Sequence, residues 1–201
     1  MMSSLYQRFK GLFREGPHAS AAGEIYMRIV EQSRLPAFFR QGAVPDTLDG
    51  RFDLIALHSF LVLHRLRDTS ADKGGADEGG ADQKTAEAKA LSQELFNAMF
   101  ADMDRGLRDL GSSDVRTPKR VKVMVEAFYG RAKAYEDGLT DPGGGLAEAL
   151  RRNLFRAVEA GEGPSALMAA YVRREAGNLA QQSLPDLIAG RLSFGPPPEG
   201  P

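Results

Sequence analysis

The stretch from Val44 to Leu66 reads VPDTLDGRFDLIALHSFLVLHRL and decides the fold of this chain. A helix built from it carries apolar groups on nearly every side, and a helix of this kind is normally buried among other helices. Charged residues interrupt it too often for a membrane span, which needs roughly 18 apolar residues. We therefore expect other helices of the chain to cover it. Its apolar residues are Phe52, Leu54, Ile55, Leu57, Phe60, Leu61, Val62, Leu63 and Leu66.

The start of this helix combines a capping signal with a glycine. Asp46 and Thr47 come first, and either side chain can accept hydrogen bonds from the free amides of the first turn. Gly50 follows, although glycine is less favourable than alanine inside a helix by about 1 kcal/mol. The glycine indicates either a helix that begins nearer Arg51 or a close approach by another part of the backbone.

The composition is that of a chain with almost no net charge and no cysteine. Its 201 residues include 26 basic and 27 acidic side chains. This length suits one domain with a sizeable core. The lack of cysteine excludes disulfides, thiol catalysis and cysteine metal sites, and it is compatible with a reducing cytoplasm. No secretory signal precedes the first helical pattern, so we expect a soluble protein.

Further stretches show helical spacing of apolar residues, and none alternates as a strand does. Pro36 should end the helix predicted over residues 21–34. Phe38 and Phe39 should then fill the core from the connector that follows this helix. We expect an all-α, single-domain helical bundle of about six to seven helices. The stretches cover residues 21–34, 86–110, 117–139, 146–158 and 165–182.

Two stretches lack the residues that form a core. Residues 69–85 are low in complexity and contain Gly-Gly-Ala-Asp twice, so we expect a disordered loop inside the domain. The tail is rich in glycine and proline and should be mobile. The predicted organisation is an amphipathic N-terminal segment over 1–18, a helical domain over 19–192 and a flexible tail over 193–201.

The N-terminal segment has the pattern of a short basic amphipathic helix. Such a helix can rest on an anionic membrane surface or a partner, or it can fold onto the core of its own protein. Amphipathicity does not separate these two interpretations, so both stay open. The residues predicted to contact a membrane surface are Leu5, Arg8, Phe9, Lys10 and Phe13.

The most basic neighbourhood of the chain surrounds the helix predicted over 117–139. Phosphate binding by RNA or a ribosome needs a cluster of this kind. A solvated helix face is the commoner explanation of a charge run, and it is favoured before any family argument. The candidate partner-binding residues here are Arg116, Lys119, Arg120, Lys122 and Arg131.

The sequence gives little support to an enzyme. Glycine-rich phosphate loops, metalloprotease motifs and nucleophile elbows are absent from it. His58 and His64 lie about 120° apart on a helix, so they cannot share a metal ion, and structural roles are the better interpretation. Asp102 and Asp104 point about 200° apart and should pair with arginines three or four positions away. We predict no catalytic residue, no metal and no cofactor.

Several blocks, taken together and in order, resemble the ubiquinol–cytochrome c chaperone family. The resemblance covers roughly residues 25 to 156, and the order of the blocks is more specific than any one of them. The blocks are RLPAFFR at 34–40, VPDTLDGRFD at 44–53, LH at 57–58, LFNAMFADMDRGLRDLG at 95–111, PKRVK at 118–122 and AFYGR at 127–131.

The resemblance implies an assembly factor for the cytochrome bc respiratory complex that binds newly made cytochrome b. A ribosome and a small partner protein are further partners that it implies, whereas DNA is not expected. The composition suggests a bacterial protein working in the cytoplasm, at the inner face of the inner membrane. The alternative function is an RNA- or ribosome-binding adaptor that uses the basic helix face without holding a client.

The resemblance also directs attention to the polar start of the central helix. A buried helix does not need this group of charges merely to fill a core. We therefore predict that the edge of a functional surface lies here, and that an exposed apolar patch or groove lies beside this helix or the helix of Phe96. The predicted partner-binding residues are Asp46, Asp49, Arg51 and Asp53.

Overall fold

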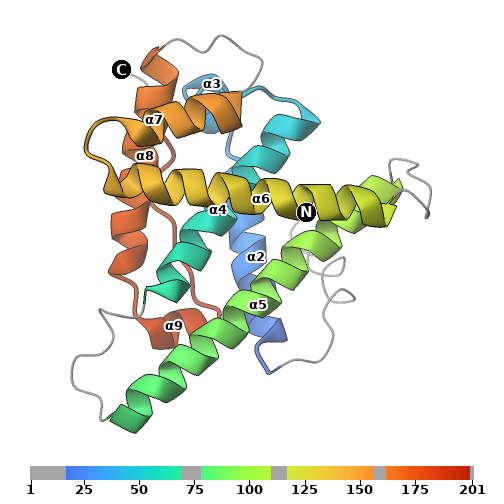
Figure 1. Cartoon of the computed structure of the whole chain (residues 1–201), viewed down its shortest axis with the longest axis vertical. Coiled ribbons are helices and arrows are strands. Elements are labelled where there is room, and N and C mark those ends of the chain that lie inside the picture. Colours follow the sequence, from blue (N-terminus) through green and yellow to red (C-terminus); the bar gives the residue numbers. More distant parts are fainter. Residues whose placement is uncertain (1–16, 69–77, 110–116, 156–161, 200–201) are drawn as a thin grey trace. The chain divides into compact units, whose positions relative to one another are not determined.

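A computed structural model describes residues 17–68, 78–109, 117–155 and 162–199, and the regular structure in these ranges is entirely helical (Figure 1). The all-α prediction is therefore confirmed. The short helices α3 and α9 add to the predicted set, and the π-helical turn η2 lies within the predicted stretch 146–158. The elements are α2 (Ala19–Ser33), α3 (Pro36–Arg40), α4 (Leu48–Arg67), α5 (Glu78–Asp109), α6 (Thr117–Thr140), α7 (Gly145–Leu150), η2 (Arg151–Phe155), α8 (Glu162–Ala180) and α9 (Leu184–Ile188).

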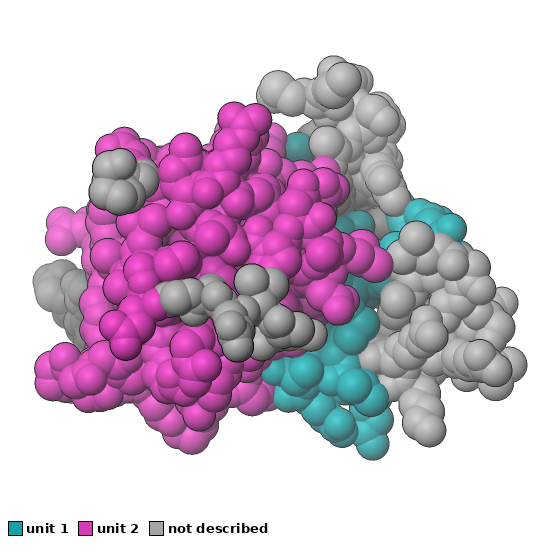
Figure 2. Space-filling view, turned by 90° about the horizontal axis from the view of Figure 1, so that it is seen from above, with its two compact units in different colours: residues 1–27, 66–127, 182–192 teal, residues 28–65, 128–181, 193–201 magenta. Residues whose placement is uncertain are grey.

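The chain forms two compact units, which are coloured separately in Figure 2. Unit 1 comprises residues 1–27, 66–127 and 182–192, and unit 2 comprises residues 28–65, 128–181 and 193–201. The predicted domain limits at residues 19 and 192 stay a prediction. Across the described residues, no helix has the length and apolar character that crossing a bilayer requires.

Unit 1 is built around helix α5, which packs against α9. Leu91, Leu95 and Met99 of α5 are fully buried, as its amphipathic pattern predicts. The helix begins at Glu78, earlier than expected, so residues 78–85 are the first turns of a helix and not part of a loop. These turns contain Gln83 and Lys84, which are good helix formers, but also Gly79 and Gly80, which are not, so helix propensity alone does not explain the extension. Residues 69–77 lie outside the described part of the chain.

Unit 2 is built around helix α4, and the prediction that this helix is covered by protein is confirmed. From Asp53 to Val62 every residue except Ile55 is buried. Phe38 is also fully buried, but it lies on α3 and not in a connector. Pro36 occupies the first turn of α3, where proline is tolerated because the amide it lacks would have no helical partner. The proline that follows α2 therefore also starts the next helix.

The C-terminal end of α6 is capped by a side chain from α8. The Arg173 guanidinium donates hydrogen bonds of 2.8 to 3.0 Å to the carbonyl oxygens of Gly138, Leu139 and Asp141. A cation at this end of a helix satisfies free carbonyls and complements the helix dipole. Helix α7 follows directly and packs against α8. These contacts fix the C-terminal half of α6 within unit 2.

Candidate functional site

The start of α4 has the geometry of a capped helix with a close backbone contact. The Thr47 hydroxyl oxygen accepts a hydrogen bond of 3.1 Å from the Gly50 amide, so the predicted N-cap is confirmed at Thr47. A Cβ atom on Gly50 would lie 2.0 Å from the Pro45 carbonyl oxygen. The second explanation offered for this glycine is thus correct, because the helix begins at Leu48 and only glycine fits where the backbone of Pro45 approaches.

The exposed charged residues at this helix start, together with Leu48 and Phe39, form what we name the α4 entrance surface. The Arg51 Nε donates a hydrogen bond of 2.6 Å to the Asp46 Oδ1, and its guanidinium carbon lies 6.0 Å from the centroid of the Phe39 ring. The hydrogen bond from Arg51 holds the pKa of the Asp46 carboxyl below its usual value. The members of the surface are Phe39, Asp46, Leu48, Asp49 and Arg51.

Leu48 is the apolar centre of the α4 entrance surface. Its side chain is 65% exposed, while Phe39 beside Arg51 is half-buried. Single exposed leucines are common on protein surfaces, but this one stands among charged side chains at a helix start. The surface therefore offers a small apolar contact surrounded by groups that can orient a partner.

Asp53 and Arg131 have a different role from the predicted one. The Asp53 Oδ1 lies 3.1 Å from the Arg131 Nη1, and the two side chains are only 1% and 10% exposed. The Arg131 guanidinium carbon also lies 5.5 Å from the centroid of the Phe52 ring. We correct the prediction that both residues contact a partner, because burial removes them from the surface. They instead join α4 to α6 within unit 2.

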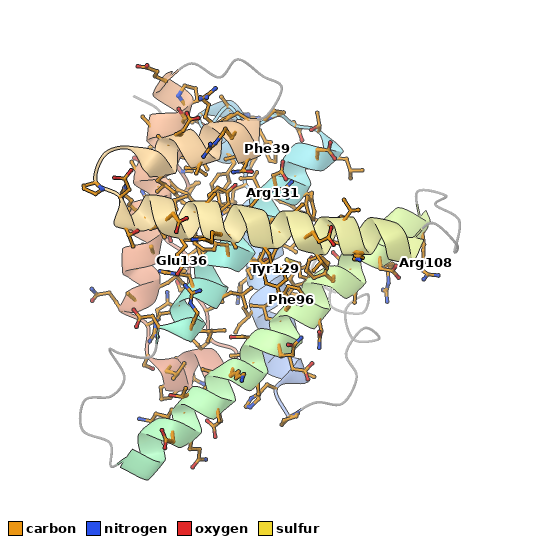
Figure 3. The ribbon with its side chains drawn as sticks, in the orientation of Figure 1. Phe39, Phe96, Arg108, Tyr129, Arg131 and Glu136 are labelled. Carbon is orange, nitrogen blue, oxygen red and sulfur yellow. The ribbon has the colours of Figure 1, made fainter. Side chains whose placement is uncertain are left out.

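The Asp53–Arg131 pair helps to set which face of α6 is exposed. Within unit 2, the buried residues of α6 are spaced by three and four positions, as one helical stripe requires. Arg131 and Tyr129 are labelled on α6 in Figure 3. They lie two positions apart, so they point about 200° from each other, and Tyr129 is 59% exposed. The inner stripe consists of Phe128, Arg131, Tyr135 and Gly138.

The structure describes only some side chains of the basic neighbourhood around α6. The Lys122 Nζ lies 3.9 Å from a Glu126 carboxylate oxygen, and the Lys133 Nζ donates hydrogen bonds of 2.9 Å to both carboxylate oxygens of Asp137. The hydrogen bond from Lys133 raises the pKa of that lysine. Each described cation of this neighbourhood is therefore near a carboxylate. The predicted contacts that lie outside the described side chains are Arg116, Lys119, Arg120, Leu5, Arg8, Phe9, Lys10 and Phe13.

Asp102 and Asp104 of α5 have separate partners. Asp104 pairs with Arg108 at 2.9 Å, as predicted from their spacing. Asp102 accepts a hydrogen bond of 3.0 Å from the Tyr26 hydroxyl, which joins α2 to α5 within unit 1. This second contact was not foreseen, because the partner lies 76 positions away. Over the described residues, no three or more metal-ligating side chains are grouped where they could hold a metal ion.

A buried polar network in unit 2 surrounds His58. The His58 Nδ1 lies 2.8 Å from the Leu54 carbonyl oxygen, and its Nε2 lies 2.7 Å from the Tyr171 hydroxyl. A carbonyl can only accept, so we assign the proton to Nδ1, and the Tyr171 hydroxyl donates to Nε2. Gln32 in turn donates to the Tyr171 oxygen at 3.1 Å, and the Nδ1 also lies 3.0 Å from the Ser33 hydroxyl. His58, Ser33 and Tyr171 are buried in this network, which holds neutral histidine.

Burial has opposite effects on the pKa values of the two ionisable groups in this contact. Removal from water lowers the pKa of His58 to about 4, because the charged imidazolium loses its hydration. Removal from water also raises the pKa of the Tyr171 hydroxyl, since phenolate is the charged form of tyrosine. Both groups are therefore neutral at pH 7. The structural role expected for His58 agrees with this geometry.

The same network holds the C-terminal segment, which we name the strap (residues 193–199). The Gly195 amide donates to Glu175 Oε2 at 2.8 Å, and the Gly195 carbonyl oxygen accepts from Gln32 at 3.1 Å. Arg174 donates to the Pro196 carbonyl oxygen and lies 3.1 Å from Glu175. Side chains of α2 and α8 therefore bind the backbone of the strap at Gly195 and Pro196, and the flexibility expected of residues 193–201 stays a prediction.

Comparison with known proteins finds one matching family model and several relatives with similar sequences. The family described as ubiquinol-cytochrome C chaperone matches residues 40–194. "Ubiquinol-cytochrome c reductase complex assembly factor 1" of Mus musculus is 24% identical over 168 residues, which are 84% of this chain and 52% of that protein. The Xenopus laevis protein of the same name is 26% identical over 155 residues, which are 77% of this chain and 70% of the frog protein.

The chain spans about half the length of the mouse and human relatives. A solved structure has a similar fold over almost the whole chain. The crystal structure of the Cbp3 homolog from Brucella abortus has a TM-score of 0.72 and 31% sequence identity, and the match covers 98% of this chain and 97% of that one. From the match to residues 40–194 and this structural similarity, we conclude that the chain belongs to the ubiquinol-cytochrome c chaperone family.

Proposed function

We propose that this chain binds newly made cytochrome b and assists assembly of the ubiquinol–cytochrome c reductase complex. Membership of the chaperone family gives the coarser role, and the names of the mouse and frog relatives state which complex those proteins help to assemble. The observation that carries the proposal is the α4 entrance surface. It lies almost wholly within the family match and presents Leu48 to solvent among charged residues.

The physical argument follows from the nature of the client. A membrane protein that has not reached its complex exposes apolar helices, and a protein that holds it needs exposed apolar contacts. Leu48 supplies such a contact, and Asp46, Asp49 and Arg51 surround it with charges that favour one orientation of the partner. The proposed action is binding, without a catalytic step.

The proposed location is the cytoplasm, at the inner face of the bacterial inner membrane where the client is inserted. The N-terminal residues from Leu5 to Phe13 are the proposed peripheral contact with anionic lipid. A ribosome or a small partner protein remains a further proposed partner, through Lys122 and the neighbouring cations of α6.

The alternative is an RNA- or ribosome-binding adaptor that acts through the basic face of α6. RNA binding needs cations that neutralise phosphates and release counterions. Lys122 and Lys133 lie near carboxylates, and Arg131 is buried against Asp53, which favours client binding over this alternative. The two functions differ in salt dependence, because phosphate binding weakens steeply as salt rises and apolar binding does not.

Deletion of the gene followed by a haem spectrum of the membranes tests the proposal. We expect loss of the cytochrome b signal and of bc complex activity, with both restored by the wild-type gene. A deletion strain with normal cytochrome b and normal bc activity would contradict the proposed function.

Variants of the α4 entrance surface then test the site in the same assay. Leu48→Glu and Arg51→Glu should restore cytochrome b poorly, although the purified variants remain folded. Arg28→Glu is a matched control, because Arg28 and Arg51 are each 60% exposed and each pairs with a nearby carboxylate. Equal restoration by all three variants would exclude the α4 entrance surface from the function.

A further inference from the structure

The strap contributes a ring to the same aromatic cluster that anchors helix α3, and α3 carries part of the α4 entrance surface. We propose that the strap is a positioning segment, in which Phe194 acts through His58 on Phe38 and so holds the α4 entrance surface in place for a client. The inference rests on the proposed function and gives a role in it to a segment outside the client-binding surface. Every residue of this connection belongs to unit 2.

Helix α3 depends on one buried side chain for its position. It has five residues, which are too few for a helix that is stable by itself in water, so packing must fix it. Phe38 is the only one of the five that is fully buried. The centroid of its ring lies 5.2 Å from that of His58 and 5.1 Å from that of Tyr171, both in edge arrangements. The Phe38 ring therefore anchors α3 on α4 and α8.

Phe38 also fixes the two parts of the chain that lead into the α4 entrance surface. Its carbonyl oxygen accepts a hydrogen bond of 3.0 Å from the Val44 amide, two residues before Asp46. The residue after it is Phe39, labelled in Figure 3, whose ring centroid lies 6.0 Å from the Arg51 guanidinium carbon. A shift of Phe38 would therefore move both the Phe39 ring and the backbone that approaches Asp46.

The strap completes the set of rings around His58. The centroid of the Phe194 ring lies 5.3 Å from that of His58, in an edge arrangement, and the Tyr171 ring lies 5.7 Å from it. Phe38 contacts the same histidine ring. Aromatic rings prefer such edge contacts, so each ring restricts where its neighbours can lie. Loss of the Phe194 ring would free one side of His58 and loosen the position of Phe38.

The backbone of Gly195 is bound on both sides, which holds Phe194 at the cluster. The Gly195 amide donates to Glu175, and its carbonyl oxygen accepts from Gln32, which also donates to the Tyr171 hydroxyl. A Cβ atom on Gly195 would lie only 2.7 Å from the Glu175 Oε1. Only glycine fits this close approach, so the strap is placed specifically and not by general apolar contact.

Amide hydrogen exchange of the full chain tests the connection to α3. We expect Phe194→Ala to speed exchange of the Val44 amide roughly tenfold, the effect of losing one edge contact between rings. The Ala189 amide in unit 1 should be unchanged, and Phe194→Tyr, which keeps the ring, should behave as the wild type. Arg173→Ala is the control, because it removes the cap of α6 in unit 2 without touching the aromatic cluster.

Gly195→Ala is a second perturbation, and it leaves every ring of the cluster present. The added Cβ atom meets the Glu175 carboxylate, so the strap must shift and carry Phe194 with it. Exchange of the Val44 amide should become faster here too. Unchanged exchange at Val44 in both strap variants would overturn the inference. Equal acceleration at Val44 and Ala189, or in Arg173→Ala, would indicate general destabilisation and would also overturn it.

Photo-crosslinking then tests the effect on the client. A photoreactive phenylalanine analogue replaces Leu48 in the full chain, and cytochrome b is synthesised in its presence. We expect Phe194→Ala to lower the yield of crosslinked cytochrome b about fivefold, a coupling of ordinary size between two sites. Phe194→Tyr and Arg173→Ala should keep the yield of the parent protein.

The crosslinking outcomes separate this inference from the proposed function. Crosslinks from position 48 with equal yields in the parent protein and Phe194→Ala would overturn the positioning role of the strap and leave the proposed function standing. An equal loss in Phe194→Ala and Arg173→Ala would likewise overturn it, because any destabilisation of unit 2 would then suffice. Absence of crosslinks to cytochrome b in the parent protein would contradict the proposed function, and this inference with it.

Discussion

Asp46 and Asp53 both pair with an arginine, but the two pairs lie in opposite environments. The Asp46–Arg51 pair at the α4 entrance is more than half exposed on both sides, whereas the Asp53–Arg131 pair is almost completely buried. An exposed pair contributes little to stability because water competes for both charges. A buried pair cannot lose one partner without leaving an unsolvated charge. The first pair is therefore available to a partner, while the second belongs to the fold.

Removing one member of the buried pair should have the largest effect on stability. We expect Asp53→Ala to lower the free energy of unfolding by about 3–5 kcal/mol, because Arg131 keeps its charge in a buried site. Denaturant unfolding of the purified protein measures this change. The double variant Asp53→Leu with Arg131→Met should recover most of the loss, since it removes both charges. A loss below about 1 kcal/mol for Asp53→Ala would show that the pair is not buried in solution.

Acid should lower the free energy of unfolding through the buried network around His58, by slightly less than the loss of one member of the Asp53–Arg131 pair. The pKa of His58 is about 4 in the folded protein and near 6.5 when unfolded, so the unfolded chain binds the additional proton first. The stabilisation is complete above pH 6.5 and is lost progressively as pH falls to about 4. At about 1.4 kcal/mol per pH unit, the free energy of unfolding should fall by about 3 kcal/mol over this window.

Denaturant unfolding at several pH values between 7 and 4 measures the effect of His58. Carboxylates also titrate in the lower part of this range, so the informative quantity is the difference from His58→Gln, which cannot titrate. The variant should show a flatter dependence on pH whatever its absolute stability. Parallel curves for the two proteins would mean that His58 is not buried as a neutral group.

Loss of Glu175 should release the strap at a moderate cost. Glu175→Ala removes the acceptor of the Gly195 amide, and we expect a decrease of about 1–3 kcal/mol in the free energy of unfolding. Hydrogen exchange of the Gly195 amide should become faster. Glu148→Ala is the control, because Glu148 is exposed and pairs with Arg151 on the surface. Unchanged exchange at Gly195 in Glu175→Ala would contradict this hold on the strap.

The smallest effect on stability is expected at the α4 entrance surface. Asp46→Asn removes the charge opposite Arg51 but leaves both side chains in water, so unfolding should not change measurably. The same variant should reduce client binding if Asp46 helps to orient the partner. A large loss of stability would assign Asp46 to the fold and weaken the contrast with Asp53.

The features that the sequence predicted correctly depend on nearby residues. The buried character of α4 follows from its apolar content, and the cap at Thr47 needs only the next turn of the helix. The pairing of Asp104 with Arg108 is likewise local. The contacts that were missed join distant positions, such as His58 with Tyr171 and Glu175 with Gly195. Glu175 lies at a position of the apolar stripe of α8. A charged residue at such a position indicates a buried polar network, and this was the feature of the sequence that could have predicted it.

The candidate site was predicted in outline and corrected in detail. The polar start of α4 was identified from its sequence, and Asp46, Asp49 and Arg51 are indeed exposed. Asp53 was predicted at the polar start of α4 and Arg131 in the basic neighbourhood of α6, but the two side chains are buried and lie against each other. Burial depends on which way each helix faces, and a single residue changes that direction by about 100°.

The sequence by itself determined the helical class of this protein, the helix at the centre of unit 2 and the family to which the chain belongs. These features rest on periodicity, capping and motif order along the chain. Only the tertiary structure decided that Arg131 faces inward, that Tyr129 faces outward and that the strap is bound. The physical reason is that these outcomes depend on the summed packing and hydrogen bonding of segments far apart in the chain, which local patterns do not specify.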